Sequence, residues 1–347
     1  MQKTIWLLMG ALFLVIGISS CDNELDVSAD WKEIAVIYGA LNPTDASQYI
    51  RIQRAYLDEK SGALSFSQIA DSLYFDTLDV TVDEFHNGAY SKTFVLNKID
   101  GNTIGLSKDS GVFASDVNYL YELDEPIKAS SFFNNYSYVL TVQNPNTDYL
   151  AISNTISVGN AEITSPINHN LILELQIPND TNNVMVAKYQ EGKFARTYDM
   201  VISVHVLEVN KLDTTQTVLK TLDWKLFGNL RTASLNGFAK ATRVINTRGF
   251  FYTLQNGLEE NDDIYRRLVG YDLRLYGIAD EFYTYINVNK PSIGIIQKKP
   301  EYTNISNGFG LFSSRYINAY RNLKFHASTR SAVMLSNDTK NLGFVSY

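Results

Sequence analysis

The sequence predicts a mainly β protein, in which an N-terminal immunoglobulin-like β-sandwich is followed by a second β-rich domain with a few short helices. Short segments rich in aromatic and β-branched residues recur along the chain, and clusters of turn-forming residues separate them, as is typical of strands. One of these segments, residues 136–143, reads YSYVLTVQ. The chain has 347 residues, of which 45% are hydrophobic, so it is long enough for about two domains with buried cores.

Residues 1–20 are expected to be a secretory signal peptide. Lys3 supplies a positive charge, residues 5–18 are apolar except for two glycines, and Ile18, Ser19 and Ser20 lead into Cys21, the single cysteine. The apolar run is shorter than the roughly 20 residues that a membrane-spanning helix needs. The alternative is an N-terminal membrane anchor in which Cys21 is an ordinary buried residue.

The residues before Cys21 resemble a bacterial lipobox, with Ile18 in place of the usual leucine and Ser20 in the small position. This resemblance implies that the signal is removed, that the thiol of Cys21 is lipidated, and that the new amine receives an acyl chain such as palmitate. Two long acyl chains contribute on the order of 20 kcal/mol of membrane affinity. We therefore expect residues 21–33 to be a tether that anchors the protein in the outer membrane through its acyl chains.

Three acidic residues follow the cysteine closely: Asp22, Glu24 and Asp26. An acidic stretch at this position is similar to the export signal of Bacteroidota surface lipoproteins. The resemblance implies that the protein faces the cell exterior. The alternative is a short solvated tether whose charges carry no signal.

Residues 34–160 are expected to form the β-sandwich. Segments 34–41 and 49–56 read as a hairpin, because the turn cluster from Asn42 to Asp45 separates them and Ile50 and Ile52 alternate with polar residues. Further strands are predicted at 78–85, 90–96, 103–106, 118–123, 136–143 and 150–158. Seven or eight short strands with turns between them favour an immunoglobulin-like sandwich.

Residues 161–347 are expected to form the second domain. Strands are predicted at 169–177, 184–189, 200–209, 217–226 and 269–275. Residues 250–258 have helical spacing, with Phe250, Phe251, Leu254 and Leu258 on one face. A second helix is predicted after residues 280 and 281, where two acids stand at its positively polarised end.

The last hundred residues carry a resemblance to a known group. The predicted helix 250–258 is followed by a strand that begins at Arg266, by an aromatic helix with Tyr283 and Tyr285, and then by the sequence TNISNGFGLF at 303–312. Together with the lipobox and the N-terminal hairpin, this order is similar to a family of Bacteroidota outer-membrane and surface lipoproteins of unknown function. The resemblance implies a lipoprotein location and a β architecture, and it assigns no catalytic residue.

The segment around residues 307–315 is the most distinctive in the chain. A dinucleotide-binding fingerprint would need a third glycine, which is missing here. We expect a turn followed by a strand that closes the second sheet, because glycine permits close backbone approach. The alternative is that the segment binds a partner or a ligand. The candidate structural or interface residues are Asn307, Gly308, Phe309, Gly310, Phe312 and Arg315.

Three short motifs are similar to the Asp-Ser/Thr acceptor that Bacteroidota use for O-glycosylation of exported proteins. They begin at Asp71, Asp76 and Asp213. The pattern is short enough to occur by chance. It makes Ser72, Thr77 and Thr214 candidate modification sites.

Composition and missing motifs exclude several function classes. Thirty basic and 37 acidic residues give a net charge of −7, which argues against a nucleic-acid partner. One cysteine excludes disulfides within the chain, Cys-ligated zinc and iron–sulfur clusters, and no two of the four histidines have metal-binding spacing. No Gly-x-Ser-x-Gly elbow occurs. We therefore expect no cofactor, no metal and no catalytic site.

Taken together, these features predict a non-enzymatic, lipid-anchored protein that serves as a binding or accessory subunit of an outer-membrane complex. The expected partner is an outer-membrane β-barrel or another surface lipoprotein, within uptake, secretion or barrel-assembly machinery. The 22 tyrosines suit such an interface, because a tyrosine side chain buries a large area and keeps a polar tip. Two alternatives stay open: a stand-alone glycan- or peptide-binding surface protein and, third, a hydrolase.

Overall fold

The computed structural model of the chain describes residues 33–55, 73–109, 111, 116–166, 172–176, 183–232, 234–290 and 301–346. These residues fold into three β-sheets with three α-helices and two short 3₁₀ helices. The predicted fold class is therefore confirmed: the protein is mainly β and has several sheets. The predicted signal peptide, Cys21 and the acids at 22, 24 and 26 lie outside the described residues.

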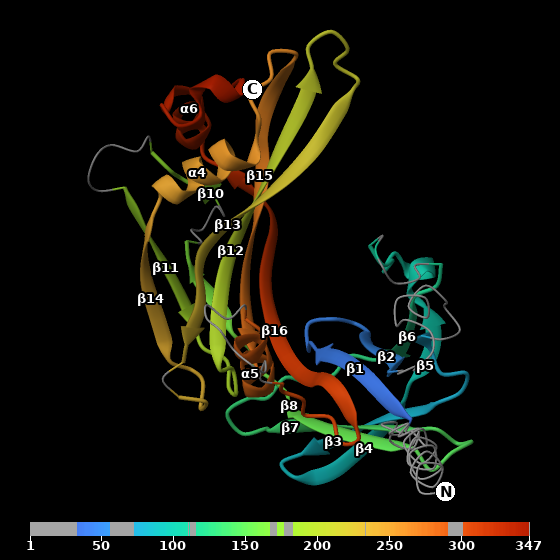
Figure 1. Cartoon of the computed structure of the whole chain (residues 1–347). Helices are drawn as coiled ribbons and strands as arrows, with labels where there is room; N and C mark the ends of the chain where they lie inside the picture. Colours follow the sequence, from blue (N-terminus) through green and yellow to red (C-terminus); the bar gives the residue numbers. More distant parts are fainter. Residues whose placement is uncertain are drawn as a thin grey trace, which may run out of the picture.

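The largest sheet has nine strands in the order β13-β12-β15-β16-β1-β2-β6-β5, with β10 paired to β16 off this path (Figure 1). Its strands come from both halves of the sequence. They are β1 (Ile34–Leu41), β2 (Gln48–Ala55), β5 (Asn97–Asp100), β6 (Tyr119–Leu123), β10 (Ile172–Leu173), β12 (Thr197–Asn210), β13 (Thr217–Arg231), β15 (Ile264–Ile278) and β16 (Gly308–Phe325). The predicted hairpin of segments 34–41 and 49–56 is confirmed as the antiparallel pair β1–β2.

A four-stranded sheet in the order β4-β3-β7-β8 packs against the N-terminal strands of the large sheet. It consists of β3 (Asp79–His86), β4 (Ala89–Val95), β7 (Tyr136–Gln143) and β8 (Leu150–Ile156). Alternation places Ile37 and Ile50 from one sheet in the same buried cluster as Val82 and Leu140 from the other. This half is a two-layer, sandwich-like arrangement around one core.

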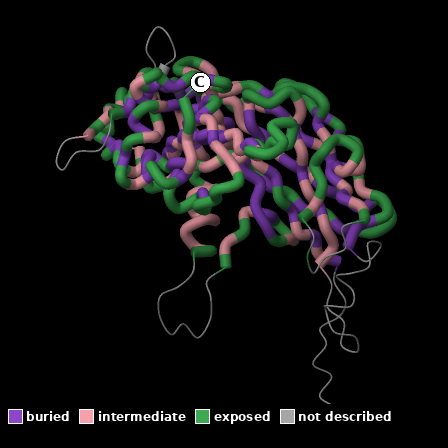
Figure 2. Tube along the Cα trace, turned by 90° about the horizontal axis from the view of Figure 1, so that it is seen from above, coloured by how far each residue is buried: buried purple, intermediate pink, exposed green. Residues whose placement is uncertain are grey.

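The second core lies beneath the long strands β12, β13 and β15. A three-stranded sheet, β14-β11-β9, and the helices α4 and α6 pack on it, and Figure 2 shows buried residues along the inside of both parts. The covering elements are β9 (Glu162–Ser165), β11 (Val184–Gln190), β14 (Lys240–Asn246), α4 (Arg248–Gly257), α6 (Ala327–Leu335) and η2 (Lys340–Leu342). The predicted amphipathic face is confirmed, since Phe250, Phe251 and Leu254 of α4 are fully buried.

Strand β16 connects the two parts. Its first seven residues pair in parallel with β1, and residues 315–323 pair antiparallel with β15 (Figure 1). Ile305 and Phe312 therefore belong to the first core, whereas Leu323 and Phe325 belong to the second. The domain boundary between residues 160 and 161 stays a prediction, and residues 301–325 contribute to both sides of it.

Two sequence-based expectations need correction. The predicted strand at 103–106 is wrong, because η1 (Gly101–Ile104) is a 3₁₀ helix there: the Asp100 side chain accepts from the Asn102 amide, and Gly105 ends the turn at a φ of +78°. The strand predicted at 169–177 is confined to the two residues of β10 within its described part.

The second predicted helix is confirmed as α5 (Asp280–Asn289). No helix among the described residues has the length and apolarity to cross a membrane.

Candidate functional site

Two phenylalanines project from the loop that precedes β7. Phe132 is 66% exposed and Phe133 is 80% exposed, and their rings meet edge to face with centroids 4.8 Å apart. An exposed phenylalanine leaves a large apolar area in contact with water. Two of them side by side are therefore unfavourable on a surface that no partner ever covers. The pair is the first mark of an interaction site.

A third aromatic side chain joins them from a distant part of the sequence. Phe238, in the connection between β13 and β14, is 39% exposed, and its ring lies 5.8 Å from that of Phe132. Phe238 and the preceding Gly237 both have positive φ values, of +64° and +72°. A positive φ is uncommon for a bulky residue and persists where the surroundings enforce it. We call Phe132, Phe133 and Phe238 the phenylalanine surface.

The β3–β4 turn holds this loop through Asn87. The Asn87 amide donates to the Asn135 carbonyl, and the Asn135 amide donates back to the Asn87 side chain, both at 2.8 Å. The Asn87 Nδ2 also donates to the Phe133 carbonyl at 3.2 Å. Asn87 has a φ of +49°, a conformation that asparagine tolerates better than most residues. The backbone that carries the phenylalanines is therefore fixed on one side.

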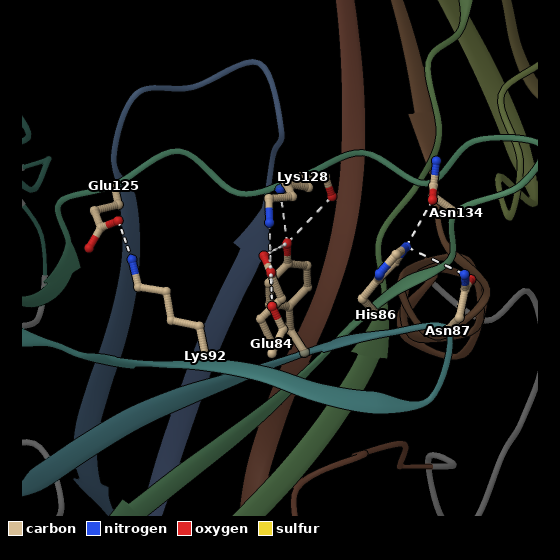
Figure 3. Close-up of polar contacts among 9 residues, drawn as sticks. Glu84, His86, Asn87, Lys92, Glu125, Lys128 and Asn134 are labelled. Carbon is tan, nitrogen blue, oxygen red and sulfur yellow. Dashed lines mark hydrogen bonds and ion pairs between the residues drawn. The ribbon is translucent and has the colours of Figure 1, made fainter.

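Two further residues, His86 and Lys193, hold the same loop. His86 Nε2 and Asn134 Oδ1 lie 2.8 Å apart, as Figure 3 shows, and the His86 ring stacks on Tyr136 at 4.9 Å. Lys193 Nζ reaches across from the second half of the chain and donates to Asn135 Oδ1 at 2.7 Å and to the Phe132 carbonyl at 3.3 Å. The loop is bonded to the β3–β4 turn through His86 and Asn87 and to the second half of the chain through Lys193, so its aromatic side chains are presented by a fixed backbone.

A buried carboxylate anchors the segment that leads into the loop. Glu84, on β3, accepts from Lys128 Nζ and from the Tyr138 hydroxyl, each at 3.0 Å, and from Ser91 (Figure 3). Burial alone would raise the pKa of Glu84, but the hydrogen bonds from Lys128, Ser91 and Tyr138 outweigh it and hold the pKa below its ordinary value. At neutral pH the carboxylate therefore ties residue 128 to the four-stranded sheet. An exposed ion pair between Lys92 and Glu125 lies beside it (Figure 3).

A polar cluster among the described residues does not have the geometry of a serine triad. On the outer face of β12 and β15, His205 pairs with Asp272, whereas the Ser203 hydroxyl donates to Asp223 at 2.5 Å. The serine is thus not hydrogen-bonded to the histidine, whereas a nucleophile–base pair requires such a bond. Among the described residues, no group of three or more histidine, cysteine, aspartate or glutamate side chains could hold a metal ion.

The structure places the predicted segment 307–315 at the start of β16. Asn307 has a φ of +52° and Gly310 a φ of +111°, so the turn and the close approach occur there. Phe309 is exposed and Phe312 is fully buried in the first core. The segment pairs with β1 before it reaches β15, so it joins the two halves of the large sheet.

The remaining predicted sites are partly visible. Gly308 is half-buried beside β1, and Arg315 pairs with Ile278 of β15. Thr77 and Thr214 are both exposed, as an O-glycosylation acceptor must be. Ser72, Cys21 and the three tether acids lie outside the described residues.

Sequence reasoning missed the phenylalanine surface. The signal was present as two adjacent phenylalanines inside the polar run SSFFNN, where neither strand alternation nor helical spacing gives them a buried face. Phe238 carries no comparable signal, because its proximity to residue 132 depends on the tertiary fold.

Comparison with known proteins adds little. No family model matches the chain, and no curated protein matches it. Among solved structures, the chain aligns with the C-terminal globular domain of an oligosaccharyltransferase from Pyrococcus abyssi at 13% identity and a TM-score of 0.24, covering 71% of this chain and 47% of that chain. It also aligns with CBD12 from CALX1.2 at 10% identity and a TM-score of 0.16, covering 81% of this chain and 98% of that chain. This chain spans about half the length of the archaeal one, and neither likeness is close enough to indicate a function.

Proposed function

We propose that this protein is a lipid-anchored, non-enzymatic binding or accessory subunit of an outer-membrane protein complex, and that the phenylalanine surface binds its partner. The observation that carries the proposal is the exposure of Phe132 and Phe133 on a loop held by hydrogen bonds from the β3–β4 turn and from Lys193. The partner is an outer-membrane β-barrel or another surface lipoprotein.

Interface physics supports this assignment. Aromatic side chains are enriched at the centres of protein–protein interfaces and carry a large share of the binding free energy there. A loop fixed before binding loses little conformational entropy in the complex, so more of the contact energy appears as affinity. A lipid anchor adds to this by raising the effective concentration of a neighbouring membrane protein.

The experiment is an affinity pull-down of the tagged full-length protein from detergent-solubilised outer membrane. The wild type is expected to recover a stoichiometric membrane-protein partner, and the double variant Phe132→Ser/Phe133→Ser is expected to lose it. Truncation of an interface hot spot costs about 2 kcal/mol or more, or roughly thirtyfold in affinity. Both phenylalanines are exposed, so the melting temperature of the variant should equal that of the wild type within about 2 °C.

Leu212→Ser is the matched control, since Leu212 is 94% exposed on a different loop. It should recover the partner as the wild type does. A double variant that retains the partner would contradict the assignment of the surface. A wild-type protein recovered alone would contradict the complex and favour a stand-alone glycan- or peptide-binding protein.

The location is tested separately through Cys21. Cys21→Ala is expected to abolish acylation and to release the protein from membranes washed with carbonate, because the acyl chains supply the anchor. Mass spectrometry of the native N-terminus checks the lipid. An unlipidated native N-terminus together with a membrane-bound Cys21→Ala variant would contradict the anchor.

Exposure to the cell exterior is tested with protease added to intact cells. The wild type is expected to be degraded, and replacement of Asp22, Glu24 and Asp26 by alanine is expected to protect the protein. Equal protection of both proteins would indicate a lipoprotein that faces the periplasm.

A further inference from the structure

The outer face of the large sheet carries an open cavity of about 350 Å³, away from the phenylalanine surface. Its position follows from strand alternation: Ile37, Ile50 and Ile52 enter the first core, so their neighbours lie on the opposite face. The cavity is lined by Tyr38, Tyr49, Arg51, Leu106, Ser107, Asn118 and Leu120.

Two tyrosines form fixed walls of this cavity. The Tyr38 ring meets the Tyr285 ring of α5 edge to face at 6.0 Å, and the two hydroxyls lie 3.1 Å apart. Tyr49 donates its hydroxyl proton to Glu122 Oε1 at 3.0 Å. Tyr38 remains 41% exposed, so part of its ring is available to a ligand.

Arg51 supplies the charge of the cavity. It lies directly opposite Tyr38 in the β1–β2 pair, and its Nε atom is buried without a hydrogen-bond partner. Within the described ranges, the Arg51 side chain forms no hydrogen bond or ion pair, and the carboxylate beside this wall, that of Glu122, accepts from Tyr49. A partly buried guanidinium without an acceptor is unfavourable, and a planar anion such as a carboxylate satisfies it through paired hydrogen bonds.

Asn118 forms part of the cavity wall, and Ser107 supplies an accessible polar group. The residue is 2% exposed, and its Nδ2 donates to the Leu106 carbonyl at 2.5 Å, which fixes the orientation of the amide. Its Oδ1 is buried and has no hydrogen-bond partner. Ser107 also lines the cavity and is exposed, so its hydroxyl is a polar group that a ligand can reach.

We propose that this cavity binds a carboxylate-bearing sugar, such as a uronic acid residue of an acidic glycan. The sugar carboxylate pairs with Arg51, a sugar hydroxyl bonds to the exposed Ser107 hydroxyl, and the apolar face of the ring lies against Tyr38. A sugar acid carries these three features in one small unit. The cavity volume falls at the lower end of the range for small-molecule sites, about 300–1,000 Å³.

The test is calorimetric titration of the full-length protein with digalacturonate and, separately, with its methyl ester, which has the same rings without the charge. We expect binding of the acid and at least about tenfold weaker binding of the ester, since hydrogen bonds to charged groups are among the stronger ones. No binding of the acid, or equal binding of the two, overturns the proposal. Equal or tighter binding of a dipeptide through its C-terminal carboxylate overturns it in favour of a peptide.

Two variants place the binding in the cavity. Arg51→Gln should weaken digalacturonate binding by at least about tenfold and leave the melting temperature unchanged or higher, because it removes a half-buried charge without a partner. Arg54→Gln is the matched control: Arg54 lies on the same strand but has its guanidinium 4.9 Å from the Phe75 ring centroid. Full binding by Arg51→Gln, or an equal loss in Arg54→Gln, overturns the assignment to this cavity.

Discussion

Gly310 lies opposite Ile37 in the parallel pair of β16 and β1, and a Cβ atom on Gly310 would overlap the Ile37 carbonyl oxygen. The glycine also has a φ of +111°, which side-chain-bearing residues rarely adopt. One residue thus combines a backbone conformation and a close approach that only glycine allows. The contact joins strands that are about 270 residues apart in the sequence.

Gly310→Ala should therefore lower the free energy of unfolding by about 3 kcal/mol, from the strained φ together with the displaced strand. Chemical denaturation of the wild type and variant measures this difference. Gly105→Ala is the control, because Gly105 has a φ of +78° but no neighbouring atom within 4 Å. It should cost only about 1 kcal/mol. Equal losses in the two variants would show that the close approach contributes nothing.

This contact also marks the limit of what the sequence predicts. Alternation and turn residues identify β1 and β7 to the residue, since those signals are local. The parallel pairing of β1 with β16 has no local signal, because it depends on two segments meeting after the whole chain has folded. The 3₁₀ helix at Gly101–Ile104 was missed because a capping aspartate and a left-handed glycine outweighed the β-branched residues between them.

The phenylalanine surface was predictable only in part. The adjacent phenylalanines are visible in the sequence, but their exposure is not, because most phenylalanines are buried. The contacts that fix their loop, from Asn87 and Lys193, span about 50 and 60 residues. Such contacts are set by the packing of the two halves and leave no periodic pattern.

The rigidity of the loop can be tested without changing a phenylalanine. Asn87→Gly keeps the positive φ but removes the side-chain hydrogen bonds to residues 133 and 135. Amide hydrogen exchange should become faster at 131–135, and partner recovery should fall by a few-fold, because a mobile loop loses more entropy on binding. Asn261→Gly, in an exposed loop of the second half, is the control. Faster exchange with unchanged partner recovery would show that rigidity of the loop is not needed.

Asp272 gives the first of two pH-dependent predictions. Burial acts to raise its pKa, but the Asn322 amide at 3.0 Å, His205 at 3.3 Å and Arg274 at 2.6 Å outweigh burial and hold the pKa below its ordinary value. Its contribution to stability is therefore complete above the pKa of an unfolded aspartate, about 3.9, and is lost as the pH falls through the lower folded-state pKa.

Asp272→Asn should consequently destabilise the protein more at pH 7 than at pH 2.5. The free energy of unfolding, measured by urea denaturation at both pH values, gives the comparison. Asp262→Asn, in an exposed loop, should change stability by no more than about 0.5 kcal/mol at either pH. A loss for Asp272→Asn that is independent of pH would indicate lost packing in place of a lost charge.

Glu281 gives the opposite sign. It lies in the first turn of α5, where the Ser313 hydroxyl donates to its Oε2 at 3.3 Å, and burial raises its pKa above the ordinary value. The folded state then holds a proton that the unfolded state releases, so stability falls as the pH rises from the pKa of an unfolded glutamate, about 4.3, through the raised folded-state pKa. Above that window the protein retains a half-buried carboxylate at a net cost. Glu281→Gln tests this sign, because it removes the charge and keeps an oxygen that accepts from Ser313.

The Glu281→Gln variant should therefore be more stable than the wild type at pH 8 and lose this advantage at pH 4. Urea denaturation at both pH values measures the two differences, with Glu301→Gln as a control at an exposed position that should change stability by no more than about 0.5 kcal/mol. A Glu281→Gln variant that is less stable than the wild type at pH 8 would show that the ionised carboxylate stabilises the contact between α5 and β16.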